Sequence, residues 1–235
     1  MHNRRYEQVF FDLDHTLWDF ETNSRETLMD LYVELALQEK GIGSFEEFHR
    51  IYQHHNLVFW DRFRKGFIKR DELRWKRMWR TLLDFQIGDE VLARQMSERY
   101  LEILPTKRNL FHDTLDILDY LKGRAYPMHL ITNGFENTQH AKIRNSGIGG
   151  YFTHVVTSEK AGIMKPHEGI FRYAMELSGA TPEKSIMIGD TLDADISGAG
   201  NVGMDTAYFN PEIPADGDIR PTFVIGSLTE LKTIL

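Results

Sequence analysis

The sequence predicts an α/β fold, a doubly wound parallel sheet that is interrupted after its first strand by an all-helical insertion. Two observations support this prediction. Short apolar runs, typical of buried strands, alternate with stretches whose apolar residues recur at helical spacing, and this alternation is typical of parallel sheets. Between about residues 20 and 104, by contrast, helical spacing dominates and no run is convincingly strand-like.

The first predicted strand covers residues 9–11 and stops at Asp12. The insertion follows, and its three apolar stripes are Leu28, Leu31, Tyr32 and Leu35; Phe45, Phe48, Ile51 and Tyr52; and Leu73, Met78 and Leu82. We therefore assign residues 18–105 to a helical domain, and residues 1–17 and 106–235 to the α/β domain.

The α/β pattern then resumes. Leu115, Leu118 and Leu121 predict a helix, and a second helix is expected to begin at Pro166. Further strands are predicted at residues 128–131, 154–156, 185–189, 204–209 and 222–225, and a surface loop at 211–218.

Composition excludes several classes of protein. The 235 residues include 28 Lys and Arg against 35 Asp and Glu, and the net charge of −7 disfavours a nucleic-acid partner. The absence of Cys excludes disulfides and thiolate metal sites. No apolar run approaches the ~18 residues of a membrane helix, and the N-terminus lacks signal-peptide architecture. We therefore expect a cytoplasmic protein with no membrane partner.

Unusual polar residues follow four of the predicted strands. Asp12 and Asp14 follow the first strand and residues 132–134 (Thr-Asn-Gly) end the second. Lys165 comes after the third, and Asp190 after the fourth, with Asp195 five residues later. Because sites in open α/β sheets lie at the carboxyl ends of strands, we expect these residues to converge.

Their chemistry indicates phosphoryl transfer. Asp12 and Asp14 point to one side of an extended chain, and neighbouring carboxylates stay ionised only if a cation compensates. With Asp190 as a third carboxylate, the all-oxygen site favours Mg²⁺. The Thr132 hydroxyl, the backbone N–H groups of residues 133–134 and the Lys165 ammonium suit a phosphate. Together these groups indicate a reaction through an aspartyl-phosphate.

The same motifs resemble those of the haloacid dehalogenase (HAD) superfamily, specifically its phosphohydrolases, with a Rossmann-like core and a helical cap of the C1 type. The matching residues are Asp12-x-Asp14-x-Thr16, Thr132, Lys165-Pro166 and Gly189-Asp190-x-x-x-x-Asp195, in the order of the family. The resemblance implies that Asp12 is the nucleophile and that Asp14 is the general acid and base. The same resemblance disfavours dehalogenation, because dehalogenases lack the second acid.

The remaining roles are also implied by this resemblance. Lys165 would neutralise the nucleophile and the phosphate, and Asp195 would position a metal-bound water or Lys165. The phosphate would be bound by Thr132, Asn133, Gly134 and Thr16. The metal would be bound by Asp12, the Asp14 backbone carbonyl and Asp190.

Within the superfamily, residues 14–20 and 158–166 are most similar to pyrimidine 5′-nucleotidases. This implies a small phosphomonoester substrate, such as dUMP, dTMP, UMP or a non-standard nucleotide, and a role in nucleotide metabolism. The alternatives are a phosphatase for phosphoglycolate or a sugar phosphate, a phosphomutase and, more distantly, a phosphoacceptor signalling domain. The oligomeric state is left open between monomer and homodimer.

Two further patterns have simpler explanations. Residues 198–203 match G-x-G-x-x-G, but they are predicted to end a helix and precede a strand, so we exclude a dinucleotide site and interpret Gly200 as a helix C-cap. Residues 61–80 hold nine Lys and Arg against three Asp and Glu. We interpret them as solvated helix faces, with a nucleic-acid-binding module as the alternative.

Overall fold

The computed structural model describes residues 5–209 and 218–235, so only Asp218 of the predicted surface loop lies within the described part of the chain. The chain divides into two compact units. One, the α/β unit, comprises Met1–Phe20 and Arg108–Leu235, and the other, the helical unit, comprises Glu21–Lys107.

The α/β unit contains a six-stranded sheet with the order β3-β2-β1-β4-β5-β6, in which every neighbouring pair is parallel. The strands are β1 (Gln8–Phe11), β2 (Met128–Thr132), β3 (Phe152–Thr157), β4 (Ser185–Gly189), β5 (Asp205–Phe209) and β6 (Phe223–Ile225). This is the order of a doubly wound sheet, in which the direction of winding reverses between β1 and β4. The predicted fold class is confirmed.

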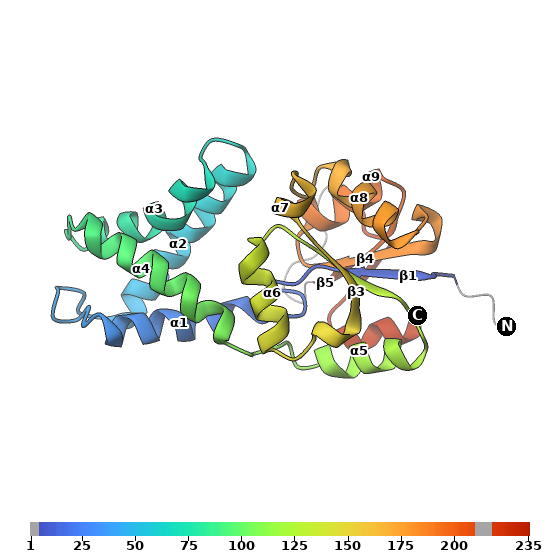
Figure 1. Cartoon of the computed structure of the whole chain (residues 1–235), viewed down its shortest axis with the longest axis horizontal. Coiled ribbons are helices and arrows are strands. Elements are labelled where there is room, and N and C mark those ends of the chain that lie inside the picture. The colour runs from blue at the N-terminus through green and yellow to red at the C-terminus, as the bar shows by residue number, and fades with distance from the viewer. Residues whose placement is uncertain (1–4, 210–217) are drawn as a thin grey trace. The chain divides into compact units, whose positions relative to one another are not determined.

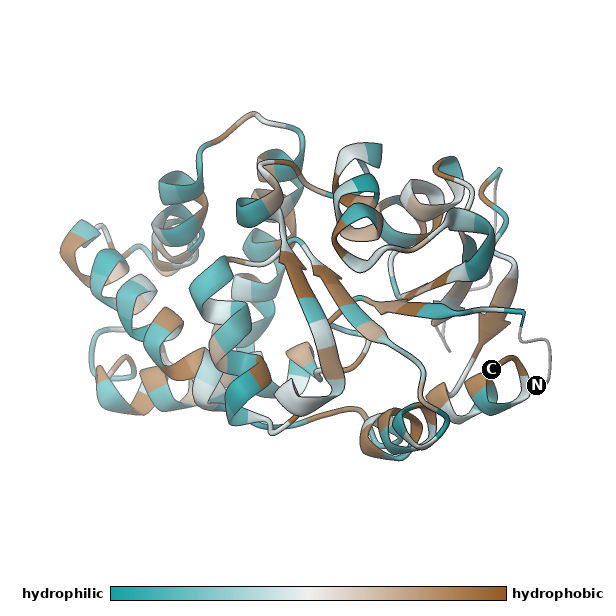
Figure 2. Ribbon diagram, turned by 45° about the vertical axis from the view of Figure 1, so that its right-hand side comes forward, coloured by the Kyte–Doolittle hydropathy of each residue, from teal (hydrophilic) through white to brown (hydrophobic). Residues whose placement is uncertain are grey.

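Helices cover both faces of this sheet (Figure 1). α8 (Glu168–Ser178) and α9 (Gly198–Asn201) lie on one face and α5 (Thr114–Gly123) on the other. The hydrophobic colour on the strands in Figure 2 reflects their burial: β2 and β4 are buried along their whole length. On the α8 side, Phe10, Met187 and Phe171 belong to one buried cluster.

The remaining helices of the α/β unit lie between strands, except for η5, which follows the last strand. They are α6 (Glu136–Asn145), η2 (Gly149–Tyr151), α7 (Ser158–Ala161), η3 (Pro182–Lys184), the π-helix η4 (Leu192–Ser197) and η5 (Leu228–Thr233). Among the described residues, no helix is long and apolar enough to cross a membrane.

Three local predictions need correction. In α5, Leu115 is exposed, because the buried face follows Ile117, Leu118 and Leu121. The helix predicted at Pro166 begins at Glu168, with His167 as its N-cap. Gly200 lies inside α9, and Gly203 is the residue with the positive φ of 87°. The G-x-G-x-x-G segment nevertheless leads out of a helix and towards β5, as predicted.

The helical unit is built from helices alone, as predicted for the insertion. They are α1 (Phe20–Glu34), whose first residue belongs to the α/β unit, α2 (Phe45–Arg64), α3 (Arg70–Asp84), α4 (Glu90–Ile103) and η1 (Leu104–Thr106). Local sequence explains two of the starts: the side chains of Ser44 and Asp89 accept from the backbone N–H groups of Glu47 and Leu92. The predicted stripes supply the core, where Leu28, Phe48 and Met78 are fully buried.

Candidate active site

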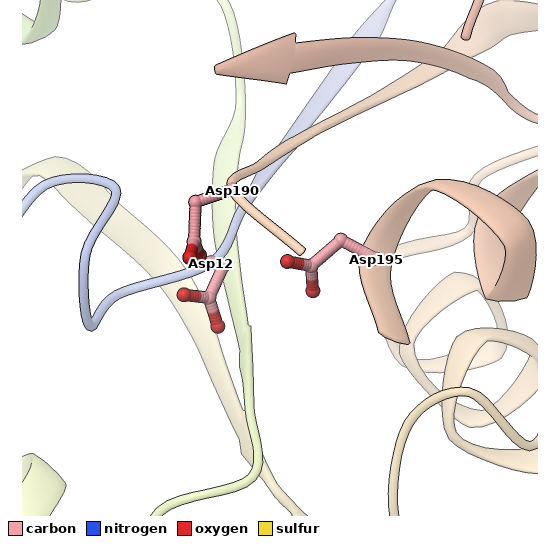
Figure 3. Close-up of side chains that lie close together, drawn as sticks. All are labelled: Asp12, Asp190 and Asp195. Carbon is pink, nitrogen blue, oxygen red and sulfur yellow. The ribbon is translucent and has the colours of Figure 1, made fainter. Parts of the chain in front are cut away.

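The candidate site lies where the direction of winding reverses. Asp12 directly follows β1, Asp190 directly follows the neighbouring β4, and the Asp12 N–H donates to Ile188 O at 2.9 Å. Crevices at such switch points are the usual ligand sites of doubly wound sheets. Asp12, Asp190 and Asp195 each place one carboxylate oxygen within 4.8 Å of the other two. Figure 3 shows these three side chains together. The structure therefore brings three predicted carboxylates together.

Lys165 joins this cluster from the loop between α7 and α8. Its side chain is 3% exposed, and Nζ donates to Oδ1 of Asp12 at 2.5 Å and to Oδ1 of Asp195 at 2.6 Å. A third bond, to Ile131 O at 2.8 Å, satisfies the remaining ammonium proton. All three donors of the buried ammonium thus have partners, and its position against Asp12 is fixed.

Asp195 is held by the turn that follows β4. Its Oδ2 accepts from the Thr191 N–H at 3.1 Å, while Oδ1 bonds to Lys165. The glycine before Asp190 makes this possible, because a Cβ on Gly189 would lie 2.5 Å from the Asp195 side chain. Asp195 thus contacts Lys165, and both roles predicted for it stay predictions.

The charges of the cluster do not balance internally. Three carboxylates face one ammonium, and the two uncompensated negative charges match a divalent cation. Burial raises the pKa of Asp12 well above its usual value, against the effect of Lys165. Burial and the Asp195 charge likewise raise the pKa of Asp190 to about 6. An all-carboxylate donor set suits a hard cation, so these residues fit Mg²⁺.

Residues 132–134 are tied to one another and to Lys165. The Gly134 N–H donates to Thr132 Oγ1 at 3.2 Å. The Asn133 side chain accepts from the Lys165 N–H at 2.8 Å and donates to Lys165 O at 3.0 Å. In this structure the Asn133 amide therefore holds the backbone that carries Lys165, whereas Thr132 ends β2 beside the cluster. Their predicted part in phosphate binding stays a prediction.

The other two residues of the first motif have different hydrogen-bond partners. Thr16 Oγ1 donates to Asp190 Oδ1 at 3.3 Å, so this hydroxyl meets the carboxylate cluster. The Asp14 side chain accepts from Lys142 Nζ at 2.6 Å and from Gln139 Nε2 at 2.9 Å, both on α6. Neither partner belongs to the motifs identified in the sequence. The sequence did contain a signal for them. Gln139 and Lys142 are polar residues three positions apart, on the same helix face as the apolar Ile143.

A family model described as haloacid dehalogenase-like hydrolase matches residues 6–203. The chain belongs to this family. The predicted resemblance is thereby confirmed, and it covers both units.

Several relatives match over nearly the whole chain. The pyrimidine 5′-nucleotidase PynA of Streptococcus pneumoniae is 31% identical, over 98% of this chain and 95% of its own. The glyceraldehyde 3-phosphate phosphatase of Methanothermobacter thermautotrophicus is 27% identical, over 97% and 98%. The magnesium-bound crystal structure of the putative HAD-hydrolase YfnB of Bacillus subtilis superposes with a TM-score of 0.86 at 29% identity, over 98% and 99%. The named functions of these relatives include two kinds of phosphatase.

Proposed function

We propose that this HAD hydrolase is a Mg²⁺-dependent phosphatase that acts on pyrimidine nucleoside 5′-monophosphates through a phosphorylated Asp12. The observation that carries the proposal is the buried contact of Asp12 with Lys165 at the sheet's switch point, 2.5 Å between Oδ1 and Nζ. Lys165 orients the carboxylate and offsets the charge of an incoming phosphate. The second acid, Asp14, favours phosphate ester hydrolysis over dehalogenation.

In the proposed reaction, an Asp12 oxygen attacks phosphorus and the bond from phosphorus to the ester oxygen breaks. Asp14 gives its proton to the departing alkoxide, which leaves as the nucleoside. Asp14 then accepts a proton from the water that attacks the phosphorylated Asp12, and inorganic phosphate is released. Lys165 neutralises charge on the transferring group throughout, and the Thr132 hydroxyl binds one of its oxygens.

Asp12 and Asp190 are the proposed side-chain ligands of Mg²⁺, together with the Asp14 backbone carbonyl. When bound, Mg²⁺ would supply charge neutralisation to the transferring phosphoryl group. Support comes from the two uncompensated charges of the cluster and from YfnB, a relative with the same fold that has been crystallised with magnesium. Asp195 is proposed to position Lys165, to which it is bonded at 2.6 Å.

The substrate class rests on similarity to PynA along nearly the whole chain. A second candidate substrate class, small sugar phosphates, is favoured by the similarity to glyceraldehyde 3-phosphate phosphatase. The α/β unit does not discriminate between them, since both classes present the same phosphate monoester to Asp12. Either class makes the partner of this site a small phosphorylated molecule.

Phosphate release by the purified protein tests both the mechanism through Asp12 and the choice of nucleotides as substrates. We expect UMP, dUMP and dTMP to be hydrolysed at least about 10-fold faster, by kcat/KM, than glyceraldehyde 3-phosphate and phosphoglycolate. EDTA and the Asp12→Asn variant should each abolish turnover, whereas Asp116→Asn, a matched change on the surface of α5, should leave it intact. Activity in Asp12→Asn would refute the mechanism, and a preference for sugar phosphates would refute the nucleotide assignment.

A further inference from the structure

Helix α6 presents two polar side chains on its buried face. Gln139 and Lys142 lie three residues apart and, with Ile143, form the buried side of the helix. Gln139 is 0% exposed and Lys142 is 3% exposed. A lysine is almost never buried without a specific partner, because its ammonium loses hydration. The partner of this one is therefore informative.

That partner is Asp14. Lys142 Nζ lies 2.6 Å from Asp14 Oδ1, and Gln139 Nε2 lies 2.9 Å from Oδ2. Each carboxylate oxygen is thus held by a different side chain of the same helix, and two points of attachment define both the position and the plane of the group. Lys142 Nζ also lies 4.3 Å from the centre of the fully buried Trp18 ring, which restricts the ammonium from a second direction.

Gln139 extends this arrangement to Thr132. Its Nε2 donates to Thr132 Oγ1 at 2.7 Å as well as to Asp14, so both amide hydrogens are used. Thr132 Oγ1 also accepts from the Gly134 N–H. With two donors directed at this oxygen, its own hydrogen is left to donate, and phosphate oxygens are acceptors. One amide therefore orients both the proposed acid and the proposed phosphate ligand.

The backbone is shaped around this amide. A Cβ on Gly134 would lie 2.3 Å from Cδ of Gln139, so only glycine leaves room for the side chain at this point. The Thr-Asn-Gly sequence at the end of β2 thus has a packing function in addition to the one predicted for its N–H groups.

We propose that Lys142 and Gln139 are positioning residues for phosphoryl transfer. Lys142 holds Asp14 in line with the leaving oxygen, and Gln139 links the orientation of Asp14 to that of Thr132. This inference rests on the proposed function, because it needs Asp14 to protonate the leaving group. It adds to that function two residues that the four strand-end motifs do not contain.

The leaving group supplies the test. A nucleoside alkoxide must be protonated as it departs, whereas p-nitrophenolate departs without help, and kcat/KM reports only the steps up to this departure. We expect Lys142→Met to lower kcat/KM for UMP by about 10²-fold but that for p-nitrophenyl phosphate by less than about 5-fold. Lys142→Arg should restore most of the loss. Lys122→Met, the same change on the exposed face of α5, should alter neither value.

A double-mutant cycle then separates positioning from packing. If Lys142 acts through Asp14, adding Lys142→Met to Asp14→Asn should lower kcat/KM for UMP by less than about 2-fold further. Gln139→Leu should reduce activity on both substrates, because Thr132 is used with either one. Equal losses on both substrates for Lys142→Met, or a full additional loss in the Asp14→Asn background, would overturn the proposal.

Failure of the proposed function gives a different result. In that case Asp12→Asn and Asp14→Asn themselves retain turnover of UMP, whatever Lys142 does. If both Asp variants lose most of their turnover and Lys142→Met matches the wild type on UMP, only the positioning role is refuted.

Discussion

The ammonium of Lys165 lies 2.5 Å from Oδ1 of Asp12, with the two side chains 3% and 10% exposed. A buried ion pair contributes little net stability compared with an apolar pair, but removal of one partner is costly because the other charge stays buried. Asp195, only 2% exposed at its side chain, depends on the same ammonium. We therefore expect Lys165 to contribute to stability as well as to the proposed chemistry.

Replacement of Lys165 by Met should accordingly affect both stability and turnover. We expect the free energy of unfolding, measured by urea denaturation, to fall by about 3–5 kcal/mol. Activity should fall at least about 10²-fold in folded protein at low temperature. Lys122→Met is the control on α5. Without Lys165, the buried carboxylates of Asp12 and Asp195 lose their shared cation. Unchanged stability in Lys165→Met would therefore contradict this account.

Mg²⁺ should stabilise the folded protein independently of turnover. At a concentration about 100-fold above its Kd, a ligand that binds only the native state adds about 2.7 kcal/mol. For a chain of this size, that raises the melting temperature by about 5–10 °C. Calorimetry with and without Mg²⁺ should show the shift in wild type and in Asp116→Asn, but a much smaller one in Asp190→Asn. A full shift in Asp190→Asn would place the ion elsewhere.

Gly189 should not tolerate even a methyl group. Its Cβ would lie 2.5 Å from the Asp195 side chain, which must then move and release Lys165. We expect Gly189→Ala to cost about 1–3 kcal/mol of stability and to lower kcat by at least about 10-fold. Gly123→Ala is the matched control, since a Cβ there meets nothing within 4 Å. If Gly189→Ala and Gly123→Ala changed stability and kcat to a similar extent, the close contact between Gly189 and Asp195 would be ruled out.

His129 should make stability depend on pH. This residue of β2 is 2% exposed, and its ring lies 4.8 Å from Phe10 and 5.3 Å from His154. Burial, and secondarily the charge of His154, lower its pKa to about 4. The unfolded chain therefore binds a proton near pH 6.5 that the folded chain does not bind until about pH 4, so this contribution to stability falls as pH falls between these values.

Urea denaturation at pH 7.5 and pH 5 measures the effect. We expect the wild type to lose about 2 kcal/mol more than His129→Phe over this interval. His112→Phe, at a fully exposed side chain, should behave as wild type does. Identical losses in the wild type and His129→Phe would mean that His129 is protonated in the folded protein as readily as in the unfolded chain.

The sequence by itself determined the sheet, the helical insertion and the residues at the strand ends. Alternation of apolar runs with helical stripes is a local signal, and it located each strand to within about two residues. The convergence of Asp12, Asp190 and Lys165 was also predictable, because the carboxyl ends of parallel strands meet at one edge whatever the details of packing. Family resemblance then gave these residues expected roles.

Only the tertiary structure decided which side chains meet. The spacing of Leu115 suited a buried helix face, but the packing of α5 selects Ile117 instead, since the face that is buried depends on how the helix rotates against the sheet. The partners of Asp14 come from α6, more than 120 residues away in the chain. A contact of this kind depends on the register of two distant elements, and no local pattern encodes it. That is why Lys142 and Gln139 emerge from the fold and not from the motifs.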